Sequence, residues 1–206
     1  AGVMGAQIAG HLANAGIPSY LFDINDELAK NGVDSLTSLK PAPLYKPKNA
    51  ELVTSCTYDN DIEKIAEVDW VLEAVVERLD IKEQVYNNLL PHLNDNAILT
   101  SNTSGIPLAD LTSSLPDDVK QRFMITHFFN PPRYMQLLEL VHGEKTSDET
   151  YNTLVEFGES VLGKGIVHAK DTPNFIGNRI GVYGMMVTMN LAIKQGLTVE
   201  EVDKLT

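Results

Sequence analysis

The sequence has little cysteine, little basic charge and no long apolar run. These three features argue against an internal disulfide, general affinity for nucleic acid and a membrane span, in that order. The single cysteine, Cys56, cannot form an internal disulfide, so a reducing compartment is the simpler expectation. With 16 basic and 28 acidic residues, the formal net charge is −12, which argues against general affinity for nucleic acid. No apolar run approaches the roughly 20 residues that span a bilayer, and we expect neither a membrane span nor a secretory leader.

Length and composition are those of an ordinary globular protein. With 206 residues, 43% hydrophobic and 21% charged, the chain can form one domain and part of another. Apolar strand-like runs alternate with helical ones through residue 171, and residues 172–206 have a helical pattern only. The pattern predicts a doubly wound, mostly parallel α/β domain over residues 1–171 and the beginning of an all-helical domain over residues 172–206.

Two segments carry more specific predictions. Residues 69–76 are strongly apolar, which predicts a strand of that length near the middle of the parallel sheet. Thr172 and Pro173 have the residue types of a helix N-cap and a first helical position. They predict a helix over residues 173–195, which is apolar on most faces and is therefore expected to be buried.

A partial dinucleotide-binding pattern lies at the start of the chain. Gly2-Val3-Met4-Gly5 matches the second half of G-x-G-x-x-G, where one glycine lets the backbone approach a pyrophosphate and the next allows close helix packing. Asp23 ends a predicted strand about 20 residues later, where an acid binds the adenosine ribose hydroxyls. No arginine follows in residues 24–26, which favours NAD over NADP. The alternatives are a glycine-rich helix start and, for Asp23, a helix N-cap.

Polar residues also follow two later strands. Glu77 comes after the apolar run, and Ser104 lies in a hydroxyl-rich loop after the next predicted strand. Ligands bind at the carboxyl ends of strands in open α/β sheets, although serine in a loop is often only a turn former. A basic, proline-rich stretch over residues 36–50 is either a solvated linker or a landing place for the phosphates of an anionic substrate.

His127 and Glu139 are the strongest candidates for catalysis. The histidine ends one predicted strand, and the glutamate lies twelve residues later as the one carboxylate of a mostly apolar strand. If the two strands are neighbours, the carboxylate can fix the tautomer of the imidazole, which suits a general base near neutral pH. The alternative is a strand-capping histidine and a glutamate at a solvated edge.

Five motifs together resemble a known family. In chain order they are Gly2-Val-Met-Gly5, Glu73-Ala-Val-Val-Glu77, Ser101-Asn-Thr-Ser104, His127-Phe-Phe-Asn130-Pro131 and Lys170-Asp-Thr-Pro-Asn-Phe-Ile-Gly-Asn178-Arg179. Their order and spacing resemble the 3-hydroxyacyl-CoA dehydrogenases of fatty acid β-oxidation, with a Rossmann-like domain. The residues within these motifs are most similar to those of large bacterial proteins that join this dehydrogenase to an enoyl-CoA hydratase.

The resemblance implies a role for each matching residue. It makes His127 the general base, Glu139 its orienting partner, and Ser104 and Asn178 hydrogen-bonding groups around the reacting carbon. The cofactor is NAD and the substrate an L-3-hydroxyacyl-CoA. The implied cofactor-binding residues are Gly2, Val3, Met4, Gly5, Asp23, Glu77, Lys82, Ser104 and Asn130.

Three departures from the family pattern imply a fragment. The first strand and first glycine are absent, residues 25–48 are too short for the helical hairpin that helps hold CoA, and the helical domain stops after Thr206. We therefore expect weak NAD binding by this segment alone. The family implies a homodimer formed through the helical domain and a fused or associated hydratase.

Two other functions stay open: a Rossmann dehydrogenase of free hydroxy acids, and a non-catalytic protein that keeps the fold. Dehydrogenases of free hydroxy acids commonly use a lysine in the helical domain as the base, and residues 173–184 contain no lysine. The other histidines have no Cys, Asp or Glu at ligand spacing, so we predict no metal. The expected location is the cytoplasm of a bacterium, or mitochondria or peroxisomes in a eukaryote.

Overall fold

The structure is a computed structural model that describes residues 1–205, so Thr206, at the end of the predicted helical segment, lies outside the described residues. The strands are β1 Ser19–Asp23, β2 Val53–Thr57, β3 Trp70–Glu73, β4 Ile98–Ser101, β5 Phe123–Phe128, β6 Leu137–His142 and β7 Gly165–His168. The α-helices are α1 Val3–Asn14, α2 Asp26–Ser38, α3 Tyr58–Asp61, α4 Leu79–Leu89, α5 Leu108–Leu111, α6 Asp117–Gln121, α7 Asp148–Glu156, α8 Gly177–Gln195 and α9 Val199–Val202. Short 3-10 segments span Pro47–Leu52, Ile62–Glu67 and Leu90–His92, and a π-helical turn spans Phe157–Val161.

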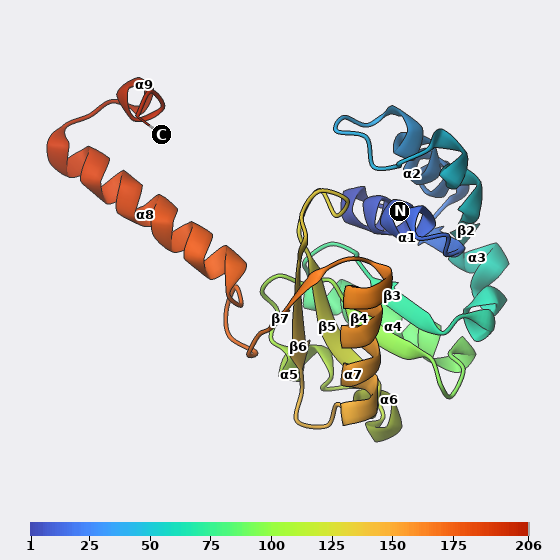
Figure 1. The fold of residues 1–206 in the computed structure, drawn as a ribbon. Helices are drawn as coiled ribbons and strands as arrows, with labels where there is room; N and C mark the ends of the chain where they lie inside the picture. Colours follow the sequence, from blue (N-terminus) through green and yellow to red (C-terminus); the bar gives the residue numbers. More distant parts are fainter. Residues whose placement is uncertain (206) are drawn as a thin grey trace.

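The strands form two sheets that are mostly parallel. β1 pairs with β2, and the second sheet has the order β3-β4-β5-β6-β7. Within residues 1–205, only the β5–β6 pair is antiparallel. β1 and β3 are not hydrogen-bonded to each other, and a cavity of about 1360 Å³ is lined by residues of both strands and of α1. Figure 1 shows β1, β2, α1 and α2 grouped on one side of the larger sheet.

Helices cover both faces of the larger sheet. Side chains of β5 alternate between two cores, because successive residues of a strand point to opposite faces. Phe123 and Ile125 pack with α4, α5 and α6, whereas Met124 and Phe128 pack with α1 and α7. The arrangement confirms the predicted Rossmann-like α/β class.

Local signals explain where several helices begin and end. α1 ends before Gly16, whose φ of +81° is the left-handed conformation that glycine adopts without strain. The side chain of Asn25 accepts a hydrogen bond from the Leu28 N–H and caps α2. Because Asn25 is the N-cap, the alternative that Asp23 serves as the cap is wrong.

The strand predicted over residues 69–76 is too long. β3 ends at Glu73, whose carboxylate accepts a hydrogen bond from the Val75 N–H at 2.7 Å and closes a turn. Trp70, Val71 and Leu72 are only partly buried, because β3 lies at the margin of its sheet beside the cavity. The apolar sequence identified the strand but not its end, which a side-chain hydrogen bond determines.

The prediction of a buried helix over residues 173–195 is also wrong in two respects. α8 begins at Gly177, because Asn174 (φ 62°) and Phe175 (φ 45°) have left-handed backbone conformations that interrupt the helix, and Phe175 enters the core. None of the residues of α8 is buried, and Figure 1 shows the helix extending away from the α/β part. Among the described residues, no helix is both long enough and apolar enough to cross a membrane.

Candidate active site

His127 and Glu139 form a buried hydrogen-bonded pair. They face each other in the antiparallel register of β5 and β6, and directly opposite residues of such a pair project from the same face of the sheet. The distance from Nδ1 of His127 to Oε2 of Glu139 is 2.7 Å, and the two residues are 6% and 0% exposed. The predicted meeting of these side chains is confirmed. With Glu139 ionised, Nδ1 is the donor and Nε2 retains its lone pair.

The second carboxylate oxygen of Glu139 holds the start of α8. Oε1 accepts hydrogen bonds from the N–H groups of Ile176 at 3.0 Å and Gly177 at 2.7 Å. Asn178 is the next residue and is partly buried. The same carboxylate therefore orients the imidazole and anchors the segment that carries Asn178.

Two aromatic rings enclose the imidazole. The ring of Phe129 lies 4.6 Å from the His127 ring, centroid to centroid, and the ring of Phe175 lies at 5.6 Å in an edge-to-face arrangement. Phe175 comes from the interrupted turn before α8, so the left-handed conformations at Asn174 and Phe175 bring an apolar wall to the histidine. Apolar walls restrict water around the pair and strengthen its electrostatic interaction.

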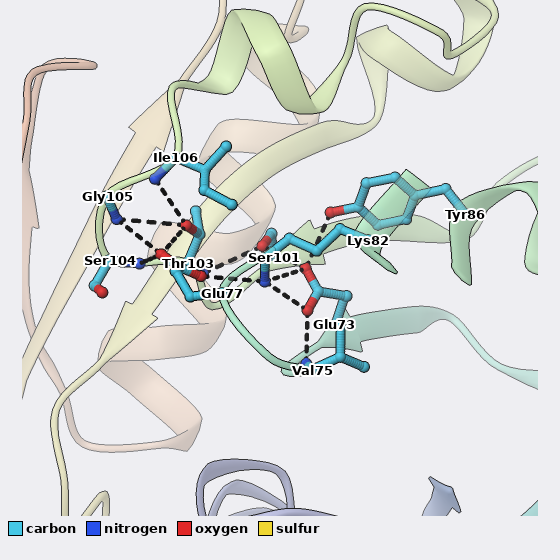
Figure 2. A network of polar contacts seen from close by, with 10 residues as sticks. All are labelled: Glu73, Val75, Glu77, Lys82, Tyr86, Ser101, Thr103, Ser104, Gly105 and Ile106. Atoms are coloured by element: carbon cyan, nitrogen blue, oxygen red, sulfur yellow. Dashed lines mark hydrogen bonds and ion pairs between the residues drawn. The ribbon is translucent and has the colours of Figure 1, made fainter. Parts of the chain in front are cut away.

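The loop that carries Ser104 is attached to the strand of His127. The side-chain oxygen of Asn102 accepts a hydrogen bond from the Phe128 N–H at 2.9 Å. Ser104 itself is partly buried, and Figure 2 shows its hydroxyl pointing away from the polar network of the loop. Within residues 1–205, no hydrogen bond joins His127 to Ser104 or Asn178.

Glu77 binds the Ser104 loop through one carboxylate oxygen. Its Oε1 accepts hydrogen bonds from the Thr103 hydroxyl at 2.6 Å and from the N–H groups of Ser104 and Gly105 at 2.9 and 3.1 Å (Figure 2). Burial acts to raise the pKa of Glu77. The hydrogen bonds from Thr103 and Ser104, together with the charge of Lys82, outweigh burial and hold this pKa below its usual value.

Lys82 lies deeper than a direct cofactor ligand would. Its side chain is 1% exposed, and its ammonium lies 2.8 Å from Oε1 of Glu73 and 3.4 Å from Oε2 of Glu77. Figure 2 shows Lys82 between these two carboxylates. In this arrangement Lys82 contacts Glu77, whose side chain is 42% exposed.

The start of α1 fits a dinucleotide phosphate. Gly2 is the N-cap without a side-chain hydrogen bond, and a Cβ added there would have no heavy atom within 4 Å. Val3 and Met4 form the first turn, whose N–H groups and helix dipole favour an anion. At Gly5 an added Cβ would meet Ala74 and Leu21 only at 3.9 Å, so the close packing expected there is not required sterically.

Asp23 and Asn130 lie at or just after the carboxyl ends of two strands, β1 and β5. Asp23 is at the carboxyl end of β1, where its Oδ2 lies 2.9 Å from the Ala1 amino group. Asn130 is exposed after β5, and its side-chain oxygen accepts a hydrogen bond from Gln7 of α1 at 3.1 Å. A carboxylate at the end of β1, unblocked helix N–H groups and an exposed amide are groups of the kind that bind NAD, so the residues present fit this cofactor.

Sequence reasoning missed the groups that support the site. Glu73 was identified only as part of a motif, although it lies at the centre of the network that holds Lys82. The available signal was a carboxylate within an apolar strand, followed nine residues later by a lysine in the next helix. The anchoring of Ile176 and Gly177 by Glu139 had no sequence signal. Among residues 1–205, no group of three or more His, Cys, Asp or Glu side chains could hold a metal ion.

Comparison with known proteins identifies the family. The family model for the 3-hydroxyacyl-CoA dehydrogenase NAD binding domain matches residues 1–172. A probable 3-hydroxyacyl-CoA dehydrogenase from Deinococcus radiodurans is 44% identical over 213 residues, covering 100% of this chain and 62% of the relative. A protein of the same description from Bacillus subtilis is 42% identical over 226 residues, covering 100% of this chain and 29% of the relative.

A longer protein and a solved crystal structure are also similar to this chain. A putative fatty acid oxidation complex trifunctional enzyme from Rickettsia prowazekii is 40% identical, and the match covers 100% of this chain and 29% of that protein. The crystal structure of (S)-3-hydroxybutyryl-CoA dehydrogenase from Ralstonia eutropha matches with a TM-score of 0.83 and 29% identity, covering 97% of this chain and 71% of that one.

The chain thus spans between about a third and two thirds of the length of these curated relatives. The match of the family model agrees with the mostly parallel fold and with the helix N-terminus suited to a dinucleotide. The chain belongs to the 3-hydroxyacyl-CoA dehydrogenase family, and residues 1–172 are its NAD-binding domain.

Proposed function

We propose that the protein transfers a hydride between NAD and the 3-hydroxyl carbon of an L-3-hydroxyacyl-CoA, as a step of fatty acid β-oxidation. The observation that carries the proposal is the buried His127–Glu139 pair at the end of β5, at 2.7 Å, on a domain that binds NAD. A dehydrogenase of this kind needs one proton acceptor beside the carbon that loses the hydride.

His127 is the general base in this proposal. Its Nε2 accepts the proton of the 3-hydroxyl group as the carbon–hydrogen bond breaks, and the C–O bond becomes a carbonyl. When bound, NAD would supply the redox chemistry as the hydride acceptor. Glu139 keeps the proton on Nδ1 and stabilises the imidazolium that forms. In the reverse direction the imidazolium returns its proton to the oxygen.

Ser104 and Asn178 are proposed to bind the substrate oxygen. The Ser104 hydroxyl points away from the loop network, so it is available to a ligand (Figure 2). Asn178 follows the two N–H groups that Glu139 holds, which fixes its backbone relative to His127. Neutral donors stabilise developing charge on oxygen and leave the basicity of His127 intact.

The cofactor residues keep their proposed roles with one change. When NAD is bound, the N–H groups of the first turn, from Val3 to Gly5, would face the pyrophosphate, Asp23 would bind the adenosine ribose, and Asn130 would contact the cofactor. We propose that Glu77 faces the cofactor and that Lys82 acts behind it, because the lysine is buried against Glu73.

The remaining proposals concern the rest of the protein. A domain boundary near Asp171 leaves residues 172–206 as the beginning of a helical domain that completes the acyl pocket and forms a homodimer. The exposed apolar side chains of α8, including Ile180, Tyr183 and Met189, support this assignment. The match to a relative described as a fatty acid oxidation complex trifunctional enzyme supports fusion or association with further activities, for which we propose an enoyl-CoA hydratase. The proposed location is the bacterial cytoplasm, or mitochondria or peroxisomes in a eukaryote.

Steady-state measurement of NADH formation tests the activity. The purified protein is assayed with NAD and an L-3-hydroxyacyl-CoA, the D-enantiomer, and the corresponding free hydroxy acid. Turnover restricted to the L-thioester supports the proposal, whereas equal rates with the free acid favour a hydroxy-acid dehydrogenase. Absence of NADH with all three, while calorimetry detects NAD binding, favours a non-catalytic role.

A further inference from the structure

A buried carboxylate that takes no part in the proposed chemistry lies at the centre of a polar network behind the site. Glu73 ends β3, and its side chain is 0% exposed. Its oxygens accept hydrogen bonds from the Lys82 ammonium at 2.8 and 3.0 Å, the Ser101 hydroxyl at 2.6 Å, the Tyr86 hydroxyl at 3.0 Å and the Val75 N–H at 2.7 Å (Figure 2). Such a fully bonded carboxylate fixes its donors in place, because each would lose a buried partner by moving.

The first route from Glu73 to Ser104 passes through Lys82 and Glu77. The ammonium of Lys82 bridges the two carboxylates, at 2.8 Å from Glu73 and 3.4 Å from Glu77. The opposite oxygen of Glu77 then accepts the N–H of Ser104 at 2.9 Å. A single buried cation therefore links Glu73 to the backbone of the proposed substrate-binding serine.

The second route is independent of the lysine and passes through Ser101. The Ser101 hydroxyl donates its hydrogen to Glu73, and its oxygen accepts the Thr103 N–H at 3.2 Å. The Thr103 hydroxyl in turn donates to Glu77 and accepts the N–H of Ile106 at 3.1 Å. Both ends of the loop that carries Ser104 are thus connected to the same carboxylate.

Tyr86 is a further hydrogen-bond donor to Glu73. Burial and the Glu73 carboxylate raise the pKa of Tyr86, so this phenol is a hydrogen donor at neutral pH. With Lys82 and Ser101 also donating, Glu73 can serve only as an acceptor. An uncharged amide cannot replace it, because glutamine has one acceptor oxygen and would present an N–H₂ group to one of these donors.

We propose that Glu73 is a positioning residue for the dehydrogenase site: it sets the position of Ser104 and Glu77 through Lys82 and Ser101. The proposal rests on the proposed function for its catalytic consequence, but the linkage itself is a property of the loop. It also assigns Lys82 to this linkage in place of direct contact with the cofactor.

Amide hydrogen exchange tests the linkage without reference to activity. In Glu73→Gln the amides of Ser104 and Gly105 should exchange faster by on the order of 10-fold, since Lys82 loses the carboxylate that fixes it beside their acceptor Glu77. Amides of β5 from Phe123 to His127 should exchange as in the wild type. A matched control is Leu154→Ala on α7, a core substitution that lowers stability on the other face of the sheet. Equal exchange at Ser104 and Gly105 in Glu73→Gln and wild type, or the same increase in Leu154→Ala, would overturn the proposal.

A double-mutant cycle tests the catalytic consequence. Glu73→Gln should lower kcat by on the order of 10-fold with a smaller change in KM for the acyl-CoA, because misplacement affects the transition state more than binding. Combined with Ser104→Ala, the further loss from Glu73→Gln should shrink to about 2-fold or less, since the two act through one group. The same factor in both backgrounds overturns the proposal.

Two outcomes separate this inference from the proposed function. If wild-type protein forms no NADH, the proposed function fails and the exchange measurement alone decides the linkage. If Glu73→Gln does not fold, Lys82→Met interrupts the first route and Ser101→Ala the second, and unchanged exchange at the Ser104 amide in both variants overturns the proposal.

Discussion

Nδ1 of His127 and Oε2 of Glu139 lie 2.7 Å apart on directly opposed residues of antiparallel strands. The register fixes both side chains on the same face of the sheet, and the burial of both residues excludes water from the bond. The pair therefore holds one imidazole tautomer before any ligand binds, with the lone pair on Nε2.

Replacement of His127 by glutamine should abolish most of the turnover. Glutamine cannot accept the proton, so kcat should fall by about 10²–10⁴-fold. NAD affinity should stay within about 2-fold, because the substitution removes no proposed cofactor contact. Stopped-flow kinetics and calorimetry measure the two quantities. The control is His142→Gln, an exposed position on β6, and wild-type turnover in His127→Gln would refute the assignment of the base.

Glu139→Gln tests the tautomer rather than the presence of the imidazole. If the amide N–H₂ faces Nδ1, the ring proton moves to Nε2 and the base is blocked, so kcat should fall by on the order of 10³-fold. Nuclear magnetic resonance of ¹⁵N-labelled histidine should show the changed tautomer directly. An unchanged His127 tautomer together with normal turnover would contradict the role given to Glu139.

Gln7→Ala should weaken NAD binding without affecting the chemistry. Gln7 donates a hydrogen bond to the side-chain oxygen of Asn130 at 3.1 Å, which leaves the amide N–H₂ of Asn130 oriented for a ligand. Loss of this one hydrogen bond should raise the Kd for NAD by about 2- to 10-fold. Gln84→Ala, at an exposed glutamine of α4, is the control. Equal Kd values in all three proteins would show that Gln7 does not orient Asn130.

His11 should make the fold sensitive to acid. Burial, followed by the charge of Lys164, lowers the pKa of His11 from 6.5 to about 4. The imidazole of the unfolded chain is therefore protonated below about pH 6.5, whereas that of the folded chain is protonated only below about pH 4. The free energy of unfolding consequently falls as the pH falls through this range. Between pH 7 and pH 5 the loss should be about 2 kcal/mol. Urea unfolding at the two pH values measures it.

The variant His11→Gln should lose this part of the pH dependence. His142→Gln should retain it, because it leaves the buried imidazole in place. If His11→Gln and wild type lose the same stability between pH 7 and pH 5, another group is responsible for the acid sensitivity.

Sequence patterns were sufficient to predict that the side chains of His127 and Glu139 meet. His127 and Glu139 could be placed together because strand periodicity and chain order leave few ways to pair two consecutive strands. The doubly wound class and the NAD preference followed from equally local signals, the glycine spacing and the acid at the end of β1.

The errors arose where a side chain far along the sequence determines the backbone. Thr172 and Pro173 are good helix-start residues, yet α8 begins at Gly177, because Phe175 enters the core and Glu139 binds the first N–H groups of the helix. Local propensity contains no information about such tertiary contacts. β3 is short for a different reason, because the Glu73 carboxylate closes a turn by accepting the N–H of Val75, two residues later.

The shared carboxylate of Glu139 has a consequence for mutation. One oxygen binds the imidazole and the other binds the backbone at the start of α8, so a displacement of the first turn of α8 also displaces the group that orients His127. The orientation of the base and the position of the segment that carries Asn178 therefore cannot be changed independently of each other.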